Sequence, residues 1–186
     1  LIGILHIPSV NLEPTPLYRY ATVEEAQPIS DREDAALATA LYSWRNKDVH
    51  RIEFGDHNYQ NFGPLKFVEV GNVAFIKVQD KVVRMTCVSA TLSETLDEYN
   101  ESIIRDHETV TTVTCYGNDT RTVVRWKITD DSDITFDELF WIVGKYRVAQ
   151  RDSSFADKNI DNAEFQEATD PTQAITQDNV GEKHET

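Results

Sequence analysis

The sequence predicts a mainly β protein whose short strands form a β-barrel or another closed sheet, with few helices. Three observations favour this fold. At least five short runs are rich in β-branched and apolar residues, and turn sequences such as Gly71-Asn72 and Gln79-Asp80 separate them. Only two stretches have helical spacing. Hydrophobic residues make up 40% of the 186 residues, which is enough for a substantial core.

The expected strands follow one another along the chain. The first covers residues 1–7, and a short continuation at 10–12 precedes Pro14 and Pro16, which we expect to end regular pairing. The later strands are expected at 51–54, 73–78, 81–88, 110–115 and 121–128.

The first of the two expected helices covers residues 30–42. Ser30 can act as its N-cap, and its apolar face comprises Ala35, Leu37, Ala38 and Leu41.

The second expected helix covers residues 136–151, although Gly144 weakens the pattern. Its apolar stripe comprises Leu139, Phe140, Val143 and Tyr146. We expect this helix to pack on the barrel.

Charge divides the chain. Residues 128–186 carry 14 of the 32 acidic side chains but only 5 of the 18 basic ones. We therefore expect a barrel over 1–128, a helical segment that packs on it over 129–150, and an acidic, flexible tail over 151–186.

Composition excludes several classes of function. The net charge of −14 repels phosphate backbones, so nucleic acid is not an expected partner. The two cysteines are too few for a disulfide scaffold, and no zinc spacing or phosphate-binding glycine loop is present. No apolar run is long enough to cross a membrane. The chain begins at Leu1 rather than Met, so a membrane anchor upstream of it is compatible with the sequence.

Cys115 is the candidate nucleophile. It ends the strand Val110-Thr-Thr-Val-Thr-Cys115, directly before the turn Tyr116-Gly-Asn-Asp119, so its thiol is expected at the rim of the sheet. Arg121 opens the next strand, and a hairpin of this length brings its guanidinium near the sulfur. A cation there favours the thiolate or binds an oxyanion. The alternative is a small apolar residue at a strand end.

A thiol that transfers acyl groups also needs a base. Of the five histidines, His57 follows a strand and precedes a polar loop, so it too is expected at a rim. Taken alone, it also fits an ordinary surface residue. We expect Asp56, directly before it, to face solvent, the alternative being that it raises the pKa of the imidazole.

Three segments together resemble the sortase family. Thr-Val-Thr-Cys115 followed by Thr-Arg121-Thr-Val-Val resembles the sortase cysteine strand and the arginine after it. Ile2-Gly-Ile-Leu-His-Ile-Pro8 resembles the opening strand. Phe54-Gly-Asp-His57-Asn-Tyr, followed by Val70-Gly-Asn-Val-Ala-Phe-Ile76, resembles the histidine segment and the strand after it. The resemblance covers roughly residues 1–127.

This resemblance implies a closed eight-stranded barrel and a cysteine transpeptidase at the surface of Gram-positive cells. Such enzymes cleave an LPXTG-like sorting signal after Thr, hold the product as a thioacyl-enzyme, and pass it to an amine of the cell wall or of a pilin. Cys115 would be the nucleophile, His57 the general acid and base, and Arg121 the group that stabilises the oxyanion. Thr114 and Tyr116 would bind substrate beside Cys115.

Some features leave alternatives open. At strand period, Arg125 shares a face with Arg121 and is a possible substitute for it in binding substrate. Asn58 resembles class B sortases, but the connection from Cys87 to Val110 is too short for the insert of that class, so the subclass stays open. A non-catalytic sortase-fold protein that binds peptide or assembles surface structures, and a hydrolytic cysteine protease, are alternative functions.

The remaining candidates have structural interpretations. The stretch 92–107 is expected to form one wall of the peptide groove. Its carboxylates have the chemistry to bind calcium, but a solvated helical face is the favoured interpretation, and we expect neither metal nor cofactor. These carboxylates are Glu94, Asp97, Glu98 and Glu101. Cys87 is expected in the core, and Trp44 and Trp126 are expected to pack rather than bind ligand.

Overall fold

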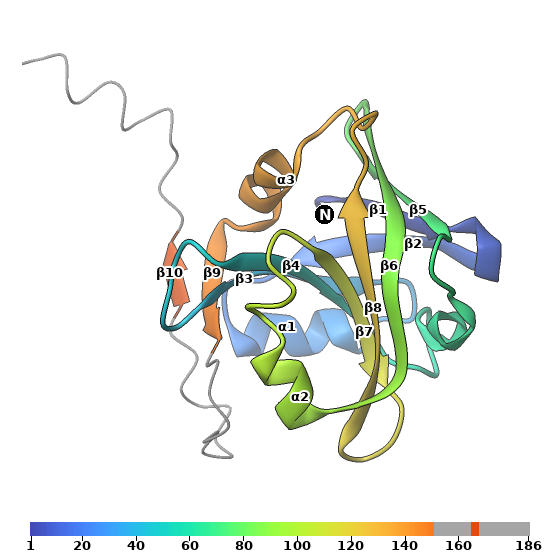
Figure 1. Ribbon diagram of the computed structural model, residues 1–186, viewed down its shortest axis with the longest axis horizontal. Helices are drawn as coiled ribbons and strands as arrows, with labels where there is room; N and C mark the ends of the chain where they lie inside the picture. Colours follow the sequence, from blue (N-terminus) through green and yellow to red (C-terminus); the bar gives the residue numbers. More distant parts are fainter. Residues whose placement is uncertain (151–164, 168–186) are drawn as a thin grey trace, which may run out of the picture.

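The computed structural model describes residues 1–150 and 165–167, and over these residues it contains a ten-stranded sheet and three short α-helices (Figure 1). The strands are β1 (Gly3–Ile7), β2 (Leu12–Arg19), β3 (Ala36–Ser43), β4 (His50–Gly55), β5 (Val73–Val78), β6 (Lys81–Thr95), β7 (Val110–Cys115), β8 (Thr120–Ile128), β9 (Tyr146–Gln150) and β10 (Phe165–Glu167). The helices are α1 (Val23–Ser30), α2 (Leu96–Glu101) and α3 (Phe136–Val143), and two 3₁₀ turns are η1 (Pro8–Val10) and η2 (Gly63–Phe67).

Eight of the strands close into a barrel. Their order is β3-β2-β1-β5-β6-β8-β7-β4, and β4 pairs with β3 to complete the ring. Most neighbours are antiparallel, but β2 with β3 and β4 with β7 are parallel. The expectation of a mainly β, closed eight-stranded barrel is therefore confirmed.

The barrel encloses the main core. Large apolar side chains from most strands are fully buried there, and α3 adds Leu139, Phe140 and Val143 to the same cluster. Trp126 is completely buried and its Nε1 donates to Thr112 Oγ1 at 3.0 Å. Cys87 is 1% exposed, and burial raises the pKa of its thiol. The core assignments of Trp126 and Cys87 are confirmed, whereas Trp44 is 48% exposed and does not pack in the core.

The prediction of a helix over residues 30–42 was wrong. In the structure, α1 ends at Ser30 and most of the expected helix is strand β3. β3 pairs with β2 along its first half, with β9 along its second half, and with β4 on its other side. β3 is also buried on both faces, and α1 and α3 contact it. A strand of this kind has a continuous apolar run without period-2 alternation. Such a run resembles a helix in sequence.

The expectation that Pro14 and Pro16 end regular pairing was wrong. Both lie within β2, where Pro16 is opposite Ile4 of β1, while β3 pairs with β2 only from Leu17 onward. Over the two prolines β2 has β1 as its one paired neighbour, so each proline, which lacks an N–H, can sit on the unpaired side.

The helix expected over residues 136–151 is correct only in its first half. α3 ends at Val143, because Gly144 serves as its C-cap, and the chain then forms β9, which pairs in parallel with β3. The acidic tail expected over 151–186 lies outside the described residues, except for β10, which pairs with β9.

No helix among residues 1–150 has the length and apolar character needed to cross a membrane.

Candidate active site

The β7–β8 hairpin brings Cys115 and Arg121 together. Cys115 is the last residue of β7, and Arg121 is its direct cross-strand partner in β8. Directly opposite residues in an antiparallel pair project to the same face, with their Cβ atoms about 4.5–5.5 Å apart. The thiol is free and half-buried at this rim of the barrel. The hairpin therefore puts Cys115 and Arg121 opposite each other at this rim, as the spacing predicts, and Arg121 Nη1 donates to the Thr120 carbonyl at 2.8 Å.

The parallel pairing of β4 with β7 brings His57 to the same rim. Gly55 is aligned with Val113, and the Asp56 N–H donates to the Val113 carbonyl at 3.3 Å. Parallel strands end at the same edge of a sheet, so the loop after β4 begins beside the end of β7. The Thr114 hydroxyl also donates to the Asp56 carbonyl at 2.7 Å. Asp56, the residue before His57, is thus hydrogen-bonded to Thr114, the residue before Cys115.

Asp56 holds the loop that carries His57. Its carboxylate accepts from the backbone N–H of His57 at 2.7 Å, and from both the backbone N–H and the side-chain amide of Asn61. Burial raises the pKa of Asp56, while these hydrogen bonds oppose the shift. The expectation that Asp56 faces solvent was wrong, because the carboxylate caps the backbone of its own loop.

Two further residues fix the imidazole of His57, and neither was predicted from the sequence. Ser30 Oγ, at the end of α1, is hydrogen-bonded to His57 Nε2 at 2.9 Å. The ring of Tyr59 stacks on the imidazole with 4.8 Å between centroids. An imidazole that is hydrogen-bonded at one nitrogen and stacked on one face is held in one orientation. Tyr59 is only two residues from His57, but no local pattern links Ser30 to it.

Arg125 is not presented beside Cys115. It is 4% exposed, its Nε donates to Asp106 Oδ2 at 2.7 Å, and its two Nη atoms bind Glu94 at 2.9 and 2.6 Å. Burial alone would lower the pKa of Arg125, but the hydrogen bonds to Glu94 and Asp106 raise it. Arg125 and Arg121 do share a face, yet Arg125 is enclosed by carboxylates. Arg121 is the arginine that the fold places at the rim.

Arg125 belongs to a buried ion network that we define as Arg51, Glu53, Glu94, Asp106 and Arg125. Arg51 is completely buried, and its Nη1 donates to Asp106 Oδ2 at 3.1 Å. Its Nη2 also lies 3.7 Å from Glu53 Oε2. The network joins β4, β6 and β8 to the loop after α2.

α2 and its following loop cover the outer face of β4, β7 and β8. Tyr99 of α2 packs with Val113 and Val123, and its hydroxyl donates to Glu53. The guanidinium of Arg51 lies 4.4 Å from the Tyr99 ring centroid. Burial holds the pKa of Tyr99 well above its ordinary value. The α2 segment therefore covers the face of β7 next to Cys115, where Val113 lies two residues earlier in the same strand.

The two residues that flank Cys115 differ in exposure. Thr114 is 5% exposed, and its hydroxyl is used to bind the His57 loop. Tyr116 is 49% exposed in the hairpin turn. The geometry thus gives Thr114 a structural contact and leaves Tyr116 accessible to a ligand.

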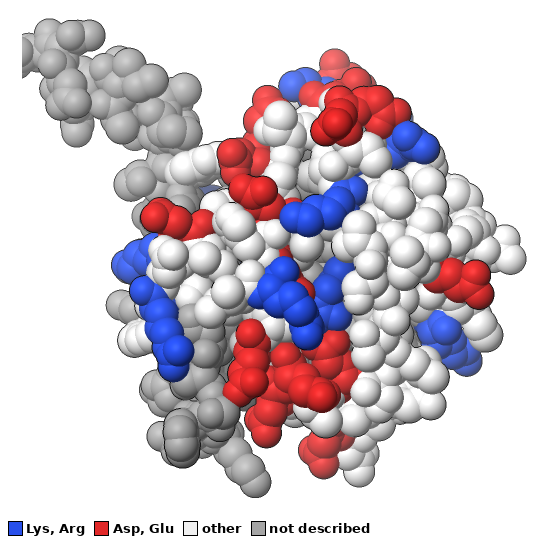
Figure 2. Space-filling view, viewed as in Figure 1, with Lys and Arg blue, Asp and Glu red and all other residues white. Residues whose placement is uncertain are grey.

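Acidic side chains gather over α2, which carries Asp97, Glu98 and Glu101 (Figure 2). Glu98 forms a capping box with Thr95, and Glu94 binds Arg125. Among the described residues, no group of three or more His, Cys, Asp or Glu side chains is arranged to hold a metal ion.

Comparison with known proteins shows which fold this is. No family model and no curated protein matches the sequence. Solved sortase structures match the fold. Sortase E1 from Streptomyces coelicolor, with a tripeptide in its active site, has a TM-score of 0.54 and 14% identity over 69% of this chain and 88% of that chain. Sortase C from Streptococcus pneumoniae has a TM-score of 0.53 and 17% identity, over 72% and 70%.

Sortase C from Clostridium perfringens also matches, with a TM-score of 0.51 and 21% identity over 69% of this chain and 70% of that chain. Because these structures represent different sortase classes, they identify the fold and leave the subclass open. The chain has the sortase fold, as the resemblance of its three segments implies.

Proposed function

We propose that this protein is a sortase-type cysteine transpeptidase. The observation that supports the proposal most is that the backbone positions of Cys115, Arg121 and His57 lie at the same rim of a sortase-fold barrel, through the β7–β8 hairpin and the β4–β7 pairing. A nucleophile, a cation and a base at one rim are the groups that acyl transfer requires.

In the proposed reaction, Cys115 gives its thiol proton to His57, and its Sγ attacks the carbonyl carbon of Thr in an LPXTG-like sorting signal to form a C–S bond. Arg121 stabilises the oxyanion of the tetrahedral intermediate. The intermediate collapses by breaking the peptide bond after Thr, and His57 protonates the leaving amine. The acceptor amine then attacks the thioester and gives a proton to His57, the C–S bond breaks, and the proton passes from His57 to the sulfur to restore the Cys115 thiol.

The substrates would be surface proteins with a sorting signal, and the acceptor an amine of the cell wall or of a pilin. The corresponding location is the outer face of a Gram-positive cell. No cofactor is needed for this chemistry.

The test is mass spectrometry of the full chain incubated with a panel of LPXTG-like peptides, with and without triglycine. Cleavage after Thr with transfer to triglycine is the expected result, and it should be lost in Cys115→Ala. Product formed without the amine at the same rate would instead indicate a hydrolytic protease. No product and no adduct on Cys115 would favour a non-catalytic peptide-binding protein.

Arg121 provides a sharper check within the same assay. We expect Arg121→Ala to lower kcat about 10²–10³-fold, the usual cost of losing one oxyanion donor. Arg84→Ala is the matched control, because Arg84 pairs with Asp131 at the surface and has no part in the proposed chemistry. Equal activity of both variants would remove Arg121 from the mechanism.

A further inference from the structure

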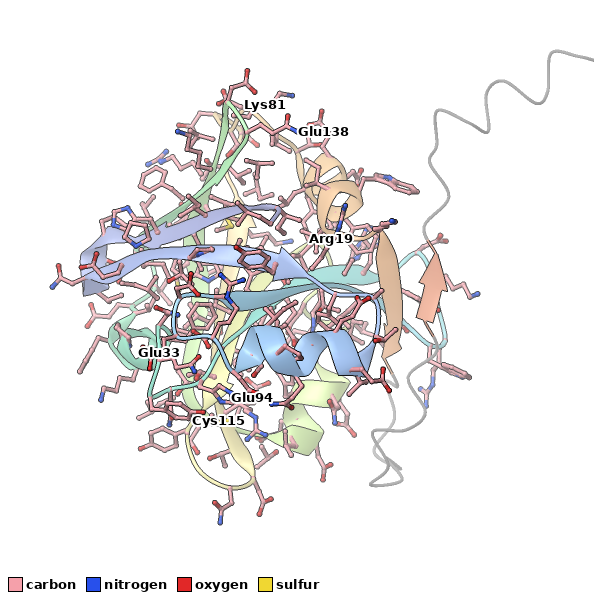
Figure 3. All side chains as sticks on the ribbon, turned by 180° about the vertical axis from the view of Figure 1, so that it is seen from behind. Arg19, Glu33, Lys81, Glu94, Cys115 and Glu138 are labelled. Atoms are coloured by element: carbon pink, nitrogen blue, oxygen red, sulfur yellow. The ribbon has the colours of Figure 1, made fainter. Side chains whose placement is uncertain are left out.

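One row of facing residues runs across β6, β8 and β7 at the rim of the candidate active site. Glu94 of β6 lies opposite Arg121 of β8, and Arg121 lies opposite Cys115 of β7. Directly opposite residues of antiparallel strands project to the same face, with Cβ atoms about 4.5–5.5 Å apart. Glu94 and Cys115 accordingly lie at the same end of the molecule (Figure 3). The row therefore includes a carboxylate residue next to the arginine of the proposed reaction.

The carboxylate of Glu94 does not bind Arg121. Among the residues that the structure describes, no carboxylate forms an ion pair with Arg121, and its Nη1 donates to the backbone carbonyl of Thr120 at 2.8 Å. A guanidinium paired with a carboxylate would offer less positive charge and fewer N–H donors to an oxyanion. The proposed role of Arg121 therefore requires that Glu94 be held elsewhere.

Arg125 is the residue that holds Glu94. Its Nη1 and Nη2 donate to the two carboxylate oxygens of Glu94 at 2.9 and 2.6 Å, which makes the pair bidentate. The two side chains are only 5% and 6% exposed, so solvent screens the pair little. Arg125 is four residues from Arg121 on the same face of β8, so the two arginines are alternative partners for one carboxylate.

The other cation near Glu94 is a weaker partner. Arg105 Nη2 lies 3.3 Å from Glu94 Oε1, and the Arg105 side chain is 63% exposed, where solvent weakens an ion pair. Asp106, by contrast, accepts from both Arg125 Nε at 2.7 Å and Arg51 Nη1 at 3.1 Å. Loss of Arg125 would thus leave Asp106 with a buried arginine, but would leave Glu94 with the exposed Arg105.

We propose that Arg125 is a positioning residue, which keeps Arg121 available to the oxyanion by holding Glu94 away from it. A buried carboxylate is stable only when it is paired, so Glu94 turns to Arg121 when Arg125 is lost. The inference rests on the proposed function, in which Arg121 stabilises the oxyanion. It gives a role in the reaction to an arginine that is itself enclosed and does not reach the rim.

The first test is a pair of variants in the peptide-transfer assay. We expect Arg125→Met to lower kcat about tenfold or more and to change KM less than about twofold, because the lost interaction belongs to the transition state. Adding Glu94→Gln to this variant should bring kcat back to within about threefold of wild type, since a neutral amide does not cancel the charge of Arg121. A double variant as slow as Arg125→Met would overturn the proposal.

Arg51→Met is the matched control. Arg51 is buried in the same ion network and binds Asp106, but its replacement leaves Arg125 in place to hold Glu94. We expect it to lower stability, as Arg125→Met does, and to keep kcat within about twofold of wild type at a temperature where both variants are folded. Equal losses of kcat in the two variants would mean that the network acts through stability alone, against the proposal.

The NMR signal of the Arg121 Nε–H tests the same contact without turnover, in the ¹⁵N-labelled full chain. This signal, assigned with Arg121→Lys, should shift in Arg125→Met and return in the double variant. Glu94→Gln alone should leave it in place, and this arm holds even if Arg125→Met does not fold. A shift in Glu94→Gln would show that Glu94 already binds Arg121 and would contradict the proposal.

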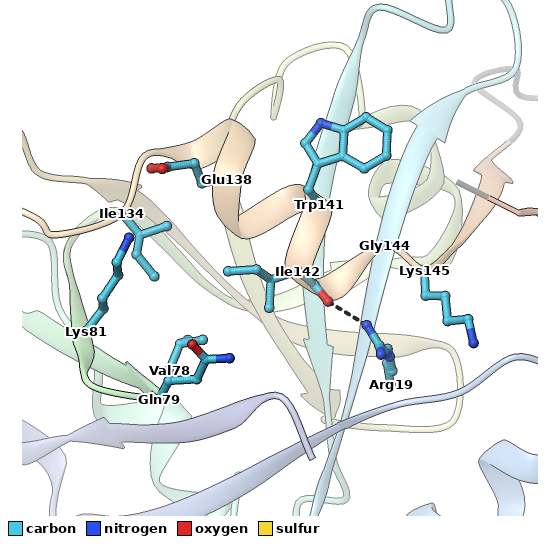
Figure 4. A pocket seen from close by; sticks show the side chains of 10 residues that line it. All are labelled: Arg19, Val78, Gln79, Lys81, Ile134, Glu138, Trp141, Ile142, Gly144 and Lys145. Carbon is cyan, nitrogen blue, oxygen red and sulfur yellow. Dashed lines mark hydrogen bonds between the residues drawn. The ribbon is translucent and has the colours of Figure 1, made fainter. Parts of the chain in front are cut away.

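Arg19→Met is the NMR control for the loss of a guanidinium. Arg19 lies away from Cys115 (Figure 3), and its Nη1 donates to the Ile142 carbonyl at 2.9 Å beside α3 (Figure 4). Its replacement should not move the Arg121 signal. The expected signal changes without any peptide transfer would uphold the hold of Arg125 on Glu94 and contradict the proposed function. Peptide transfer with an unmoved Arg121 signal in Arg125→Met would support the proposed function and overturn this inference.

Discussion

At the scale of single residues, the candidate site depends on how the imidazole of His57 is held. Ser30 binds Nε2 from α1, and Tyr59 stacks on the ring from the loop after β4. A base that must accept and later return a proton works only in the right orientation. These contacts make Ser30 a positioning residue for the proposed reaction.

We expect Ser30→Ala to lower kcat about five- to tenfold with little change in KM, the effect of losing one hydrogen bond of about 1 kcal/mol. Ser30→Thr keeps a hydroxyl and should restore most of the activity. Ser93→Ala, which changes an exposed serine of β6, is the control. The readout is the peptide-transfer assay over a range of pH, in which Ser30→Ala should also displace the pH profile. An unchanged profile with lower stability would make Ser30 merely structural.

The partly buried carboxyl of Asp56 predicts how the stability of the fold depends on pH. Burial raises its pKa in the folded state above the ordinary value of 3.8. A carboxyl with a raised folded pKa favours folding when it is protonated, so its contribution is present at low pH and is lost as pH rises through the folded pKa. Urea unfolding between pH 3 and 7 should show wild type losing stability relative to Asp56→Asn as pH increases. The opposite trend would mean that the hydrogen bonds to Asp56 outweigh its burial.

At the scale of elements, the loop from β4 to η2 fixes His57 by close backbone approach. A Cβ added at Gly63 would lie 2.5 Å from the Asn58 carbonyl oxygen, so the two backbone segments can meet only if residue 63 is glycine. By contrast, a Cβ at Gly55 would lie 3.8 Å from its nearest neighbour, Val113 Cγ1.

Gly63→Ala should therefore lower the free energy of unfolding by about 1–3 kcal/mol, the usual cost of forced overpacking. Gly55→Ala should change it by less than about 1 kcal/mol, since its new methyl group makes an ordinary contact. Thermal unfolding of both variants checks the pair. Equal losses in the two would show that the approach of Gly63 to Asn58 is not what constrains the loop.

Sequence reasoning succeeded where the determinants are local. The β7–β8 hairpin was predictable because a short turn between two β-rich runs fixes which residues face each other, so Cys115 and Arg121 could be paired. β3 could not be recognised, because burial of both its faces removes the alternation that identifies strands. Ser30 could not be linked to His57, because their contact depends on how the fold brings the end of α1 to the loop after β4.

At the scale of the whole molecule, the buried ion network joins parts of the chain that are distant in sequence. Arg51, Glu94, Asp106 and Arg125 come from β4, β6, the loop after α2, and β8. Their charges are almost entirely withdrawn from water, so each depends on its partners.

Asp106→Ala should destabilise the protein by about 3–5 kcal/mol, because it leaves Arg51 and Arg125 buried without a shared carboxylate. Asp131→Ala removes a carboxylate that pairs with Arg84 at the surface and should cost less than about 1 kcal/mol. Urea denaturation of both variants makes the comparison. A similar small loss in each would show that the network contributes little to stability.

The pairing of β3 with three strands also has a consequence for folding during synthesis on the ribosome. β3 is synthesised early, but its second half is covered by β9, which ends at Gln150. Until more than a hundred further residues emerge, that edge of the nascent barrel presents unpaired N–H and C=O groups to any neighbouring chain. The interval during synthesis is therefore when this protein is most exposed to aggregation, and a chaperone that shields strand edges would act there.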